Sequence, residues 1–406
     1  MQSQLNRQHF LDIPVGELGI VGMKGCSDLS AKVDEYISSW RQERHGQVPG
    51  EYEFIGYYKP SYLVSHDCPR FASGESKGVI NQSVRGDDLY IICDCYNYDI
   101  TYTMYGRTVY MGPDDHYQDL KRIIAAIGKK ARRINVIMPM LYGGRQHKRN
   151  GRESLDCAIM LQDLHLMGVD NIITFDAHDP RVANAIPTTS FENMKTNYQF
   201  LKALLKLFPD IEATKEKLMI ISPDEGALDR AIYYSSVLGV DMGLFYKRRD
   251  YSRIVNGRNP IVKHEFLGDS VEGKDVLIAD DIIASGESSL EIAEKLKADG
   301  ARRIFVCATF GLFTEGMEVF DMAYEKGMVD GVLSTNLVYQ SPQLLSKPWY
   351  VSVDLSKYIA YIIEHLNHDR SLSMLVDPTA RISALMKRYR AEQKEKNPQQ
   401  QMTLSV

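Results

Sequence analysis

Short apolar runs recur along the chain, and each is followed by polar or glycine-containing residues. The clearest run, residues 276–279, has charged residues on both sides, as is typical of a strand buried in a parallel sheet. Downstream, Leu290, Ala293 and Leu296 recur at a spacing of three residues and place an apolar face on a helix. This pattern predicts a strand, a short turn and a helix within residues 275–296.

The same rhythm appears in both halves of the chain. Glycines at positions 128, 168 and 300 each follow a helical pattern, and an aliphatic run follows each glycine. A helix that ends at glycine and leads into an aliphatic strand is one unit of a parallel α/β fold. Because this unit recurs in both halves, we expect two similar domains with mainly parallel central sheets flanked by helices.

Other segments give simpler expectations. Ser27 is predicted to cap a helix over residues 27–40, and residues 382–394 are predicted to form another helix. Further strands are expected at residues 18–23, 89–93, 133–138 and 218–221. Polar or tyrosine-rich composition predicts a surface insertion at 41–58, an exposed loop or small hairpin at 96–113, and a mobile polar tail after 394.

Composition narrows the class of protein. With 406 residues the chain has room for two domains, and 44% hydrophobic and 25% charged residues are ordinary values for a globular protein. A net charge of −5 gives no general reason to expect nucleic acid or a membrane surface as a partner. The N-terminus lacks an apolar signal segment, and no run reaches transmembrane length.

Six scattered cysteines lack the spacing of a metal site. They favour reduced core thiols in a cytoplasmic protein; they are Cys26, Cys68, Cys93, Cys95, Cys157 and Cys307.

The turn after the run 276–279 suggests a phosphorylated sugar. A strand, a glycine-containing turn and a helix start present free N–H groups and the positive end of a helix dipole to an anion. Asp280 and Asp281 would repel a phosphate, so we expect them to accept hydrogen bonds from hydroxyl groups nearby. Ser285 and Ser288 can donate hydroxyls or cap the helix. From these residues alone, an ordinary turn with capping serines is an equal alternative.

Two segments in the first half also indicate charged ligands. Residues 139–149 follow a predicted strand and contain two glycines and four basic side chains, a composition that favours a polyanion over a simple solvated turn. Asp176 and His178 follow another strand at positions i and i+2, so both side chains can meet one ion. Such a pair by itself is more often structural than a ligand site.

Several ordered segments resemble the ribose-phosphate pyrophosphokinase family, whose domains are of the type I phosphoribosyltransferase kind. The resemblance spans about residues 68–370. In chain order, residues 70–75 with 83–87, 145–146, 176–178, 222–227, 247–249 and 280–288 resemble the family's RFSDGE…NVRG, YARQD, DLH, SPD, KRR and phosphoribosyl-phosphate loop segments.

The resemblance implies an α/β fold with two tandem type I phosphoribosyltransferase-like domains. Residues 1–190 would form the N-terminal domain with the nucleotide loops. Residues 191–365 would form the C-terminal domain with the sugar phosphate site and the KRR segment. Residues 366–406 would add a C-terminal helix and the mobile tail.

The resemblance also implies an enzyme of nucleotide biosynthesis, a ribose-phosphate diphosphokinase. It would transfer the pyrophosphoryl group of ATP to ribose 5-phosphate, with Mg²⁺, giving PRPP and AMP. A homo-oligomer built from dimers is expected, with a hexamer as one such assembly. The implied roles are catalysis for Lys247 and Arg249; ATP binding for Phe71, Glu75, Arg145, Gln146 and His178; ribose 5-phosphate binding for Asp224, Asp280, Asp281, Ala284, Ser285, Gly286, Glu287 and Ser288; and metal binding for His178, Asp224 and Asp176.

The chain departs from the family pattern at several of these positions. Ser73 and His147 replace aspartates, Glu225 and Ala227 alter the SPD loop, and Ala284 and Glu287 alter the usual DTGGT. A non-catalytic regulatory homologue that keeps the fold is therefore one alternative. A phosphoribosyltransferase that consumes PRPP is another, although it would not need the cationic loop and Asp-x-His in a second domain.

Overall fold

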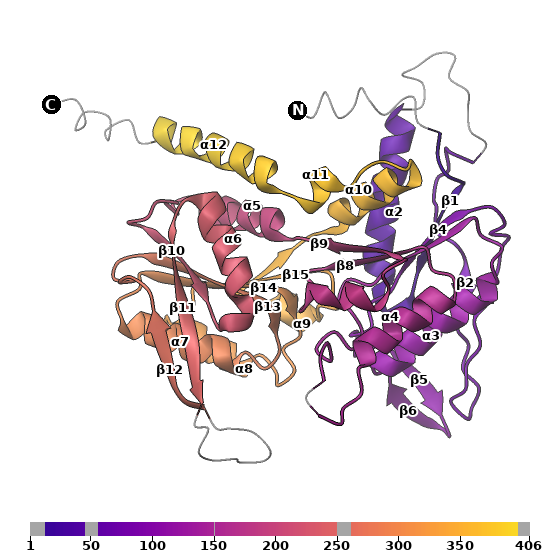
Figure 1. The fold of residues 1–406 in the computed structure, drawn as a ribbon, viewed down its shortest axis with the longest axis horizontal. Helices are drawn as coiled ribbons and strands as arrows, with labels where there is room; N and C mark the ends of the chain where they lie inside the picture. Colours follow the sequence, from indigo (N-terminus) through magenta and orange to yellow (C-terminus); the bar gives the residue numbers. More distant parts are fainter. Residues whose placement is uncertain (1–12, 45–55, 150, 250–260, 397–406) are drawn as a thin grey trace. The chain divides into compact units, whose positions relative to one another are not determined.

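The computed structural model describes residues 13–44, 56–149, 151–249 and 261–396 (Figure 1). The chain forms two compact units. Unit 1 comprises Met1–Met194, Asn336–Tyr339 and Asp354–Val376, and unit 2 comprises Lys195–Thr335, Gln340–Val353 and Asp377–Val406. Each unit is built around one central sheet.

Unit 1 contains a five-stranded parallel sheet in the order β1-β4-β7-β8-β9. Two small antiparallel pairs, β2–β3 and β5–β6, accompany it. Its strands are β1 (Leu18–Gly22), β2 (His66–Asp67), β3 (Val79–Ile80), β4 (Asp88–Ile92), β5 (Thr101–Met104), β6 (Arg107–Tyr110), β7 (Arg133–Ile137), β8 (Asn171–Phe175) and β9 (Ser190–Met194). Its helices are η1 (Lys24–Cys26), α2 (Ser27–Arg44), α3 (Pro113–Ile127), α4 (Asp156–Leu166), η2 (Pro180–Ala185), α10 (Ser356–Asn367) and α11 (Ser373–Val376).

Unit 2 contains a seven-stranded sheet in the order β12-β11-β10-β13-β14-β15-β16. Only the edge strand β12 is antiparallel to its neighbour. Its strands are β10 (Leu218–Ser222), β11 (Asp241–Arg249), β12 (Ile261–Leu267), β13 (Asp275–Ile283), β14 (Arg303–Gly311), β15 (Gly331–Thr335) and β16 (Tyr350–Val353). Its helices are α5 (Asn197–Leu207), η3 (Glu225–Ala227), α6 (Leu228–Leu238), α7 (Glu287–Ala298), α8 (Glu318–Glu325), α9 (Pro342–Leu345) and α12 (Thr379–Lys396).

The apolar pattern around residue 276 predicted the centre of unit 2. Residues 276–279 are buried in β13, which lies between β10 and β14, and α7 buries Ile292, Ala293 and Leu296 against the same core. The strand is longer than its apolar run and ends at Ile283. Asp280 and Asp281 therefore lie within the last part of β13 and not after it, because strand pairing with β14 continues past them.

The predicted surface insertion at 41–58 is wrong at its start. Residues 41–44 form the last turn of α2, and Arg41 is only 1% exposed. Its guanidinium donates to the Glu364 carboxylate (2.8 Å) and to Asn367 Oδ1 (2.8 Å). A buried arginine is stable when such partners replace water, and a local polar pattern cannot reveal those partners. Residues 45–55 lie outside the described part of the chain.

The compact units also differ from the contiguous domains that we expected. Residues 354–376 return to unit 1, where α10 packs against α2 (Figure 1). The predicted helix at 382–394 is confirmed as part of α12, and residues 397–406 of the predicted tail lie outside the described residues.

Smaller expectations have mixed outcomes. Residues 96–113 contain the expected hairpin, β5–β6. Ser27 does not cap α2: it lies inside the helix, and its hydroxyl donates to the Lys24 carbonyl (3.2 Å). The six cysteines are free thiols, and five of them are buried. In the described ranges no helix combines the length and apolar character needed to cross a membrane.

Candidate functional site

Two adjacent carboxylates stand near the end of β13 in unit 2. The Asp281 N–H donates to Asp280 Oδ1 (2.8 Å), and Asp281 is 9% exposed. Burial, and then the neighbouring Asp281 charge, raise the pKa of Asp280 to about 7, while the Arg230 charge acts in the opposite direction. Such a pair holds a proton near neutrality and offers several acceptor oxygens to hydroxyl groups of a ligand.

The segment that follows, residues 284–288, is defined by its backbone conformation. Gly286 is the N-cap of α7 with φ of 86°, and a Cβ at this position would lie 2.3 Å from the Phe320 ring. Glycine is therefore required both for the backbone conformation and for the close packing. The cap is not made by a serine side chain: the Ser285 hydroxyl accepts only a long hydrogen bond from Glu287 N–H (3.4 Å), and Ser288 is exposed in the first turn. This turn carries the N–H groups of a helix start, as an anion site requires.

Asp224 belongs to the neighbouring strand end. It follows β10, which is parallel to β13, so both strands end at the same edge of the sheet. Its Oδ1 accepts hydrogen bonds from Gly226 N–H (3.0 Å) and Ala227 N–H (3.3 Å), which fixes the side chain as the cap of η3. Glu225, one of the departures from the family pattern, is exposed.

The predicted catalytic cations lie on β11, beside β10. Lys247 is paired with His264 across the antiparallel β11–β12 ladder, and the register shifts between Arg248 and Arg249. The side chains of Lys247 and Arg249 lie outside the described part of the structure. Their assignment rests on their place in the chain.

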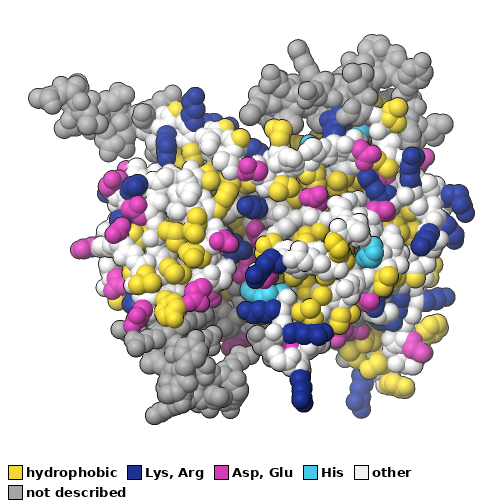
Figure 2. Space-filling model, in the orientation of Figure 1, with side chains coloured by type: hydrophobic (Ala, Val, Ile, Leu, Met, Phe, Trp, Pro, Cys, Tyr) yellow, Lys and Arg dark blue, Asp and Glu magenta, His cyan; other side chains and the backbone are white. Residues whose placement is uncertain are grey.

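In unit 1 the cationic loop follows β7. Arg145 and Gln146 are both exposed. Gly143 has φ of 65°, and a Cβ there would come within 3.2 Å of the Asp156 side chain, so the loop fits tightly against the start of α4. The Gln146 N–H donates to the Gly143 carbonyl (2.8 Å) and closes a turn. One face of the molecule shows histidines beside lysine and arginine side chains (Figure 2).

Asp176 and His178 follow β8, as expected. Asp176 has φ of 39°, a strained conformation for a residue with a side chain, and its N–H donates to the Met194 carbonyl (2.9 Å). The ring of His147 lies 5.1 Å from the ring of His178, and its Nε2 is 3.7 Å from Asp179 Oδ2. Burial, and then the proximity of His178, lower the pKa of His147. The family departure at position 147 therefore places a second imidazole beside His178.

The predicted metal ligands do not form a cluster in the part of the chain that the structure describes. No three histidine, cysteine, aspartate or glutamate side chains there are placed to hold one ion. Asp176 and His178 belong to unit 1, and Asp224 belongs to unit 2. Asp176 and Asp224 carry carboxylate oxygens, the ligand type that Mg²⁺ prefers, and Mg²⁺ takes further oxygens from waters and substrate phosphates.

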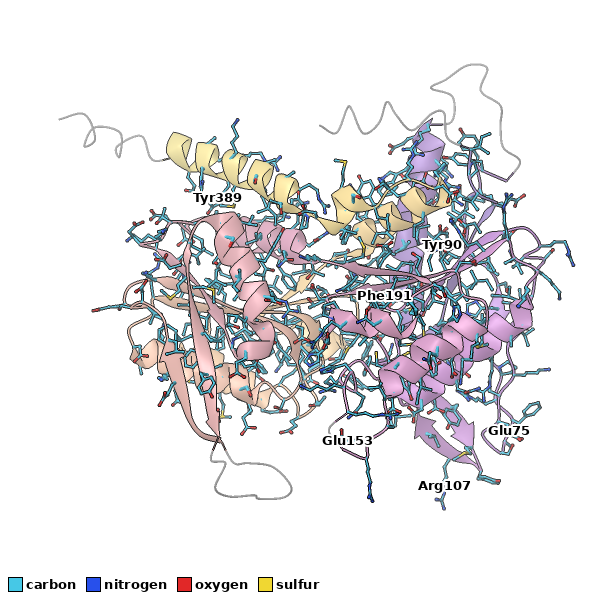
Figure 3. All side chains as sticks on the ribbon, in the orientation of Figure 1. Glu75, Tyr90, Arg107, Glu153, Phe191 and Tyr389 are labelled. Carbon is cyan, nitrogen blue, oxygen red and sulfur yellow. The ribbon has the colours of Figure 1, made fainter. Side chains whose placement is uncertain are left out.

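The segment 70–75 forms an exposed turn. The Phe71 N–H donates to the Glu75 carbonyl (2.7 Å), and the Phe71 side chain is 55% exposed. The Ser73 hydroxyl donates to Glu75 Oε2 (2.9 Å). Glu75 lies at the surface of unit 1, in the region of Arg107 on the β5–β6 hairpin (Figure 3). An exposed ring and a carboxylate are thus available to a base or to another surface.

Sequence reasoning missed two residues near these loops. Arg230 on α6 acts on the Asp280 charge. Tyr142, at the start of the cationic loop, bonds to Asp114 on α3. No local pattern marks either residue, because each acts on a partner distant in the sequence. A tyrosine directly before two glycines was the only available signal for Tyr142.

Comparisons with known proteins indicate the family that the chain resembles. A family model described as the N-terminal domain of ribose phosphate pyrophosphokinase matches residues 18–168, and one described as the phosphoribosyl synthetase-associated domain matches residues 253–377. The chain is 27% identical over 311 residues to the ribose-phosphate pyrophosphokinase of Vibrio cholerae, covering 75% of this chain and 89% of that protein. It is 28% identical over 322 residues to the ribose-phosphate pyrophosphokinase of Thermotoga maritima, covering 78% of this chain and 92% of that protein.

The fold agrees as well. The crystal structure of phosphoribosylpyrophosphate synthetase from Mycobacterium smegmatis matches with a TM-score of 0.69 at 18% sequence identity, over 87% of this chain and 99% of that chain. This match confirms the predicted α/β class with two parallel-sheet domains flanked by helices.

Proposed function

The chain belongs to the ribose-phosphate pyrophosphokinase family, and we propose that it is an active member of it. In this proposal the protein transfers the pyrophosphoryl group of ATP to ribose 5-phosphate and releases PRPP and AMP. It acts in the cytoplasm as a homo-oligomer built from dimers, and it serves nucleotide biosynthesis.

The observation that carries the proposal is the end of β13 with the turn after it. Asp280 and Asp281 are paired acceptors, and the glycine-capped start of α7 follows them directly. A sugar phosphate supplies hydroxyls for the carboxylates and an anion for the N–H groups. Asp224, at the end of the adjacent strand, completes this sugar half together with Ala284, Ser285, Glu287 and Ser288.

The loops of unit 1 supply the nucleotide half of the proposal. Arg145 and Gln146 are exposed and free to meet phosphates, and His178 stands at the end of β8. Phe71 and Glu75 offer a stacking ring and an acceptor to adenine. In a homo-oligomer this exposed turn would serve the site of a neighbouring subunit.

Mg²⁺ is the implied cofactor. Asp176 and His178 are the candidate ligands in unit 1 and Asp224 is the candidate ligand in unit 2. Each would bind the ion together with substrate oxygens, and the ion would neutralise charge on the phosphates. Lys247 and Arg249 would place fixed cations on the group that moves, where positioning and charge stabilisation provide most of the catalysis.

A non-catalytic homologue is the second candidate. Glu287 favours it, because an exposed carboxylate at the first residue of α7 opposes an anion at that helix start. The substitutions at Ser73, His147 and Ala284 point the same way.

One assay separates the candidates. The protein is incubated with Mg²⁺, ATP and ribose 5-phosphate, and AMP and PRPP are measured together. An active pyrophosphokinase forms both products in equal amounts and forms neither without ribose 5-phosphate. Binding of both ligands without either product would identify the non-catalytic homologue. Consumption of added PRPP with a base would identify a phosphoribosyltransferase.

A further inference from the structure

The side chain of Tyr142 ties the cationic loop of unit 1 to helix α3. Its hydroxyl donates to Asp114 Oδ1 at 2.6 Å, in the first turn of α3. Its ring stacks on Tyr117, one turn further along, with centroids 4.6 Å apart and planes inclined by 13°. The hydrogen bond to Asp114, together with burial, raises the pKa of Tyr142 to about 12. Tyr142 therefore remains a neutral donor throughout the physiological pH range.

The surface that receives Tyr142 is itself fixed. The Tyr117 hydroxyl donates to Asp163 Oδ2 on α4 (3.3 Å), and Lys121 forms an ion pair with the same carboxylate (3.3 Å). Two helices that pack on one sheet thus hold the ring against which Tyr142 stacks. The ring on which Tyr142 stacks is therefore held by contacts from both helices.

Little chain separates this anchor from the charged residues. Arg145 and Gln146 follow Tyr142 by three and four positions. The intervening chain is closed by the hydrogen bonds from Gly144 N–H to the Leu141 carbonyl (3.0 Å) and from Gln146 N–H to the Gly143 carbonyl (2.8 Å). A displacement of Tyr142 is therefore passed on to Arg145 and Gln146.

A restraint of this kind matters because the loop is strongly cationic. Lys148 and Arg149 are exposed beside Arg145, and like charges favour spread conformations when no anion is present. A ligand binds less tightly when it must first order a loop that has many conformations. It binds more tightly when the loop is already held in place, because less entropy is lost on binding.

We infer that Tyr142 is a positioning residue for nucleotide binding, which acts by holding Arg145 and Gln146 through its bond to Asp114. The inference rests on the proposed function in one respect, since it takes ATP as the ligand of this loop. Tyr142 is not a catalytic residue, because it bonds to the protein and not to the reacting groups.

The test removes one hydroxyl. Tyr142→Phe keeps the ring stack and loses the hydrogen bond, so the KM for ATP should rise about three- to tenfold, the range of the net contribution of one ordinary hydrogen bond. The KM for ribose 5-phosphate and kcat should stay within about twofold. Asp114→Asn retains a weaker acceptor oxygen and should raise the KM for ATP less than Tyr142→Phe does, whereas Asp114→Ala should resemble Tyr142→Phe.

Tyr389→Phe is the matched control. It removes a hydroxyl that donates to the Ile211 carbonyl (2.7 Å) in unit 2 and should leave both KM values unchanged. An unchanged KM for ATP in Tyr142→Phe, or an equal rise in both KM values, would overturn the inference.

A binding measurement separates this inference from the proposed function. Affinity for α,β-methylene-ATP with Mg²⁺ is measured by calorimetry in the parent and in Tyr142→Phe. A parent without turnover, whose affinity still falls in Tyr142→Phe, would refute the pyrophosphokinase proposal and support the positioning role. Full turnover with equal affinities in the two proteins would do the opposite. A parent that neither forms products nor binds the analogue would refute both.

Discussion

The two units present their candidate loops in different ways, although both loops follow parallel strands. In unit 2, backbone groups define both segments of the candidate site. Gly286 is the N-cap of α7 in the turn at 284–288, and the Asp224 side chain accepts hydrogen bonds from backbone N–H groups. In unit 1, the loop with Arg145 has backbone turns of its own, and its Tyr142 side chain holds it to Asp114 on α3. A site made of backbone tolerates changes in its side chains, whereas a site made of side chains depends on each of them.

This difference bears on the departures from the family pattern. Glu287 falls in the backbone-built turn, where its carboxylate is exposed and the N–H groups stay in place. Ser73 and His147 lie in the loops of unit 1, where the side chain of each contacts an expected ligand residue, Glu75 or His178. We therefore expect the substitutions in the loops of unit 1 to affect nucleotide binding more than the substitution in the turn of unit 2 affects sugar phosphate binding.

The largest expected effect lies on β11, outside both loops. Lys247→Ala should lower kcat by about a hundredfold or more, a loss of ~3 kcal/mol of transition-state stabilisation, with little change in ribose 5-phosphate binding. Steady-state kinetics with the exposed Lys206→Ala as control would measure it. Equal turnover in Lys247→Ala and the parent would remove Lys247 from the mechanism and leave the two loops to account for the rate.

The sugar half should also carry a pH signature. The pKa of Asp280, about 7, lies above its unfolded value, so its stabilising contribution is complete below about pH 4 and is lost as the pH rises through 7. Asp280→Asn cannot lose a proton. When the pH is raised from 5 to 8, the free energy of unfolding of Asp280→Asn should therefore increase relative to that of the parent by roughly 2 kcal/mol.

Urea unfolding at the two pH values would measure this gain. A difference between variant and parent that does not change with pH would mean that Asp280 is already ionised at pH 5.

Unit 1 offers a contrast in Asp94. Burial raises its pKa to about 7 as well, but no second carboxylate contributes, and the N–H groups of Tyr96 and Tyr339 act in the opposite direction.

Asp281→Asn should separate the two halves kinetically. The amide is a weaker acceptor than the carboxylate, so the KM for ribose 5-phosphate should rise about tenfold, ~1.4 kcal/mol, before that for ATP changes. Asp299→Asn, at the exposed end of α7, is the control. If only the KM for ATP responds, the assignment of β13 to the sugar is wrong.

Glu287→Gly tests the tolerance of the backbone-built turn. Because the N–H groups are expected to bind the phosphate, affinity for ribose 5-phosphate should change by less than about tenfold, ~1.4 kcal/mol. Calorimetric titration with ribose 5-phosphate would show it. A much larger gain would mean that Glu287 blocks the turn, which would favour the non-catalytic homologue.

The smallest effect should appear at the base. Ser73 donates its hydroxyl to Glu75, so one of the two acceptors of the family pattern is missing and the other is partly occupied. We expect a preference for ATP over GTP that widens about threefold in Ser73→Asp, since a second acceptor for the adenine amino group is restored. The ratio of kcat/KM for the two nucleotides measures this preference. An identical ratio in both proteins would show that position 73 does not read the base.

The sequence by itself determined the features that depend on neighbouring residues. The run at 276–279, the glycine at 286 and the strands before Arg145 and Asp176 all follow from local apolar patterns and turn chemistry. The strands, the hairpin at 96–113 and the order of the motifs could be predicted for the same reason.

Only the tertiary structure decided the features whose partners lie far along the chain. Arg41 is buried because Glu364 and Asn367 meet it on α10, and residues 354–376 join unit 1 for the same reason. Tyr142 reaches Asp114, and His147 reaches His178, through contacts that no local pattern encodes. A buried charge or an anchoring hydroxyl is stabilised by its partner in space, so its role became visible only when the chain was folded.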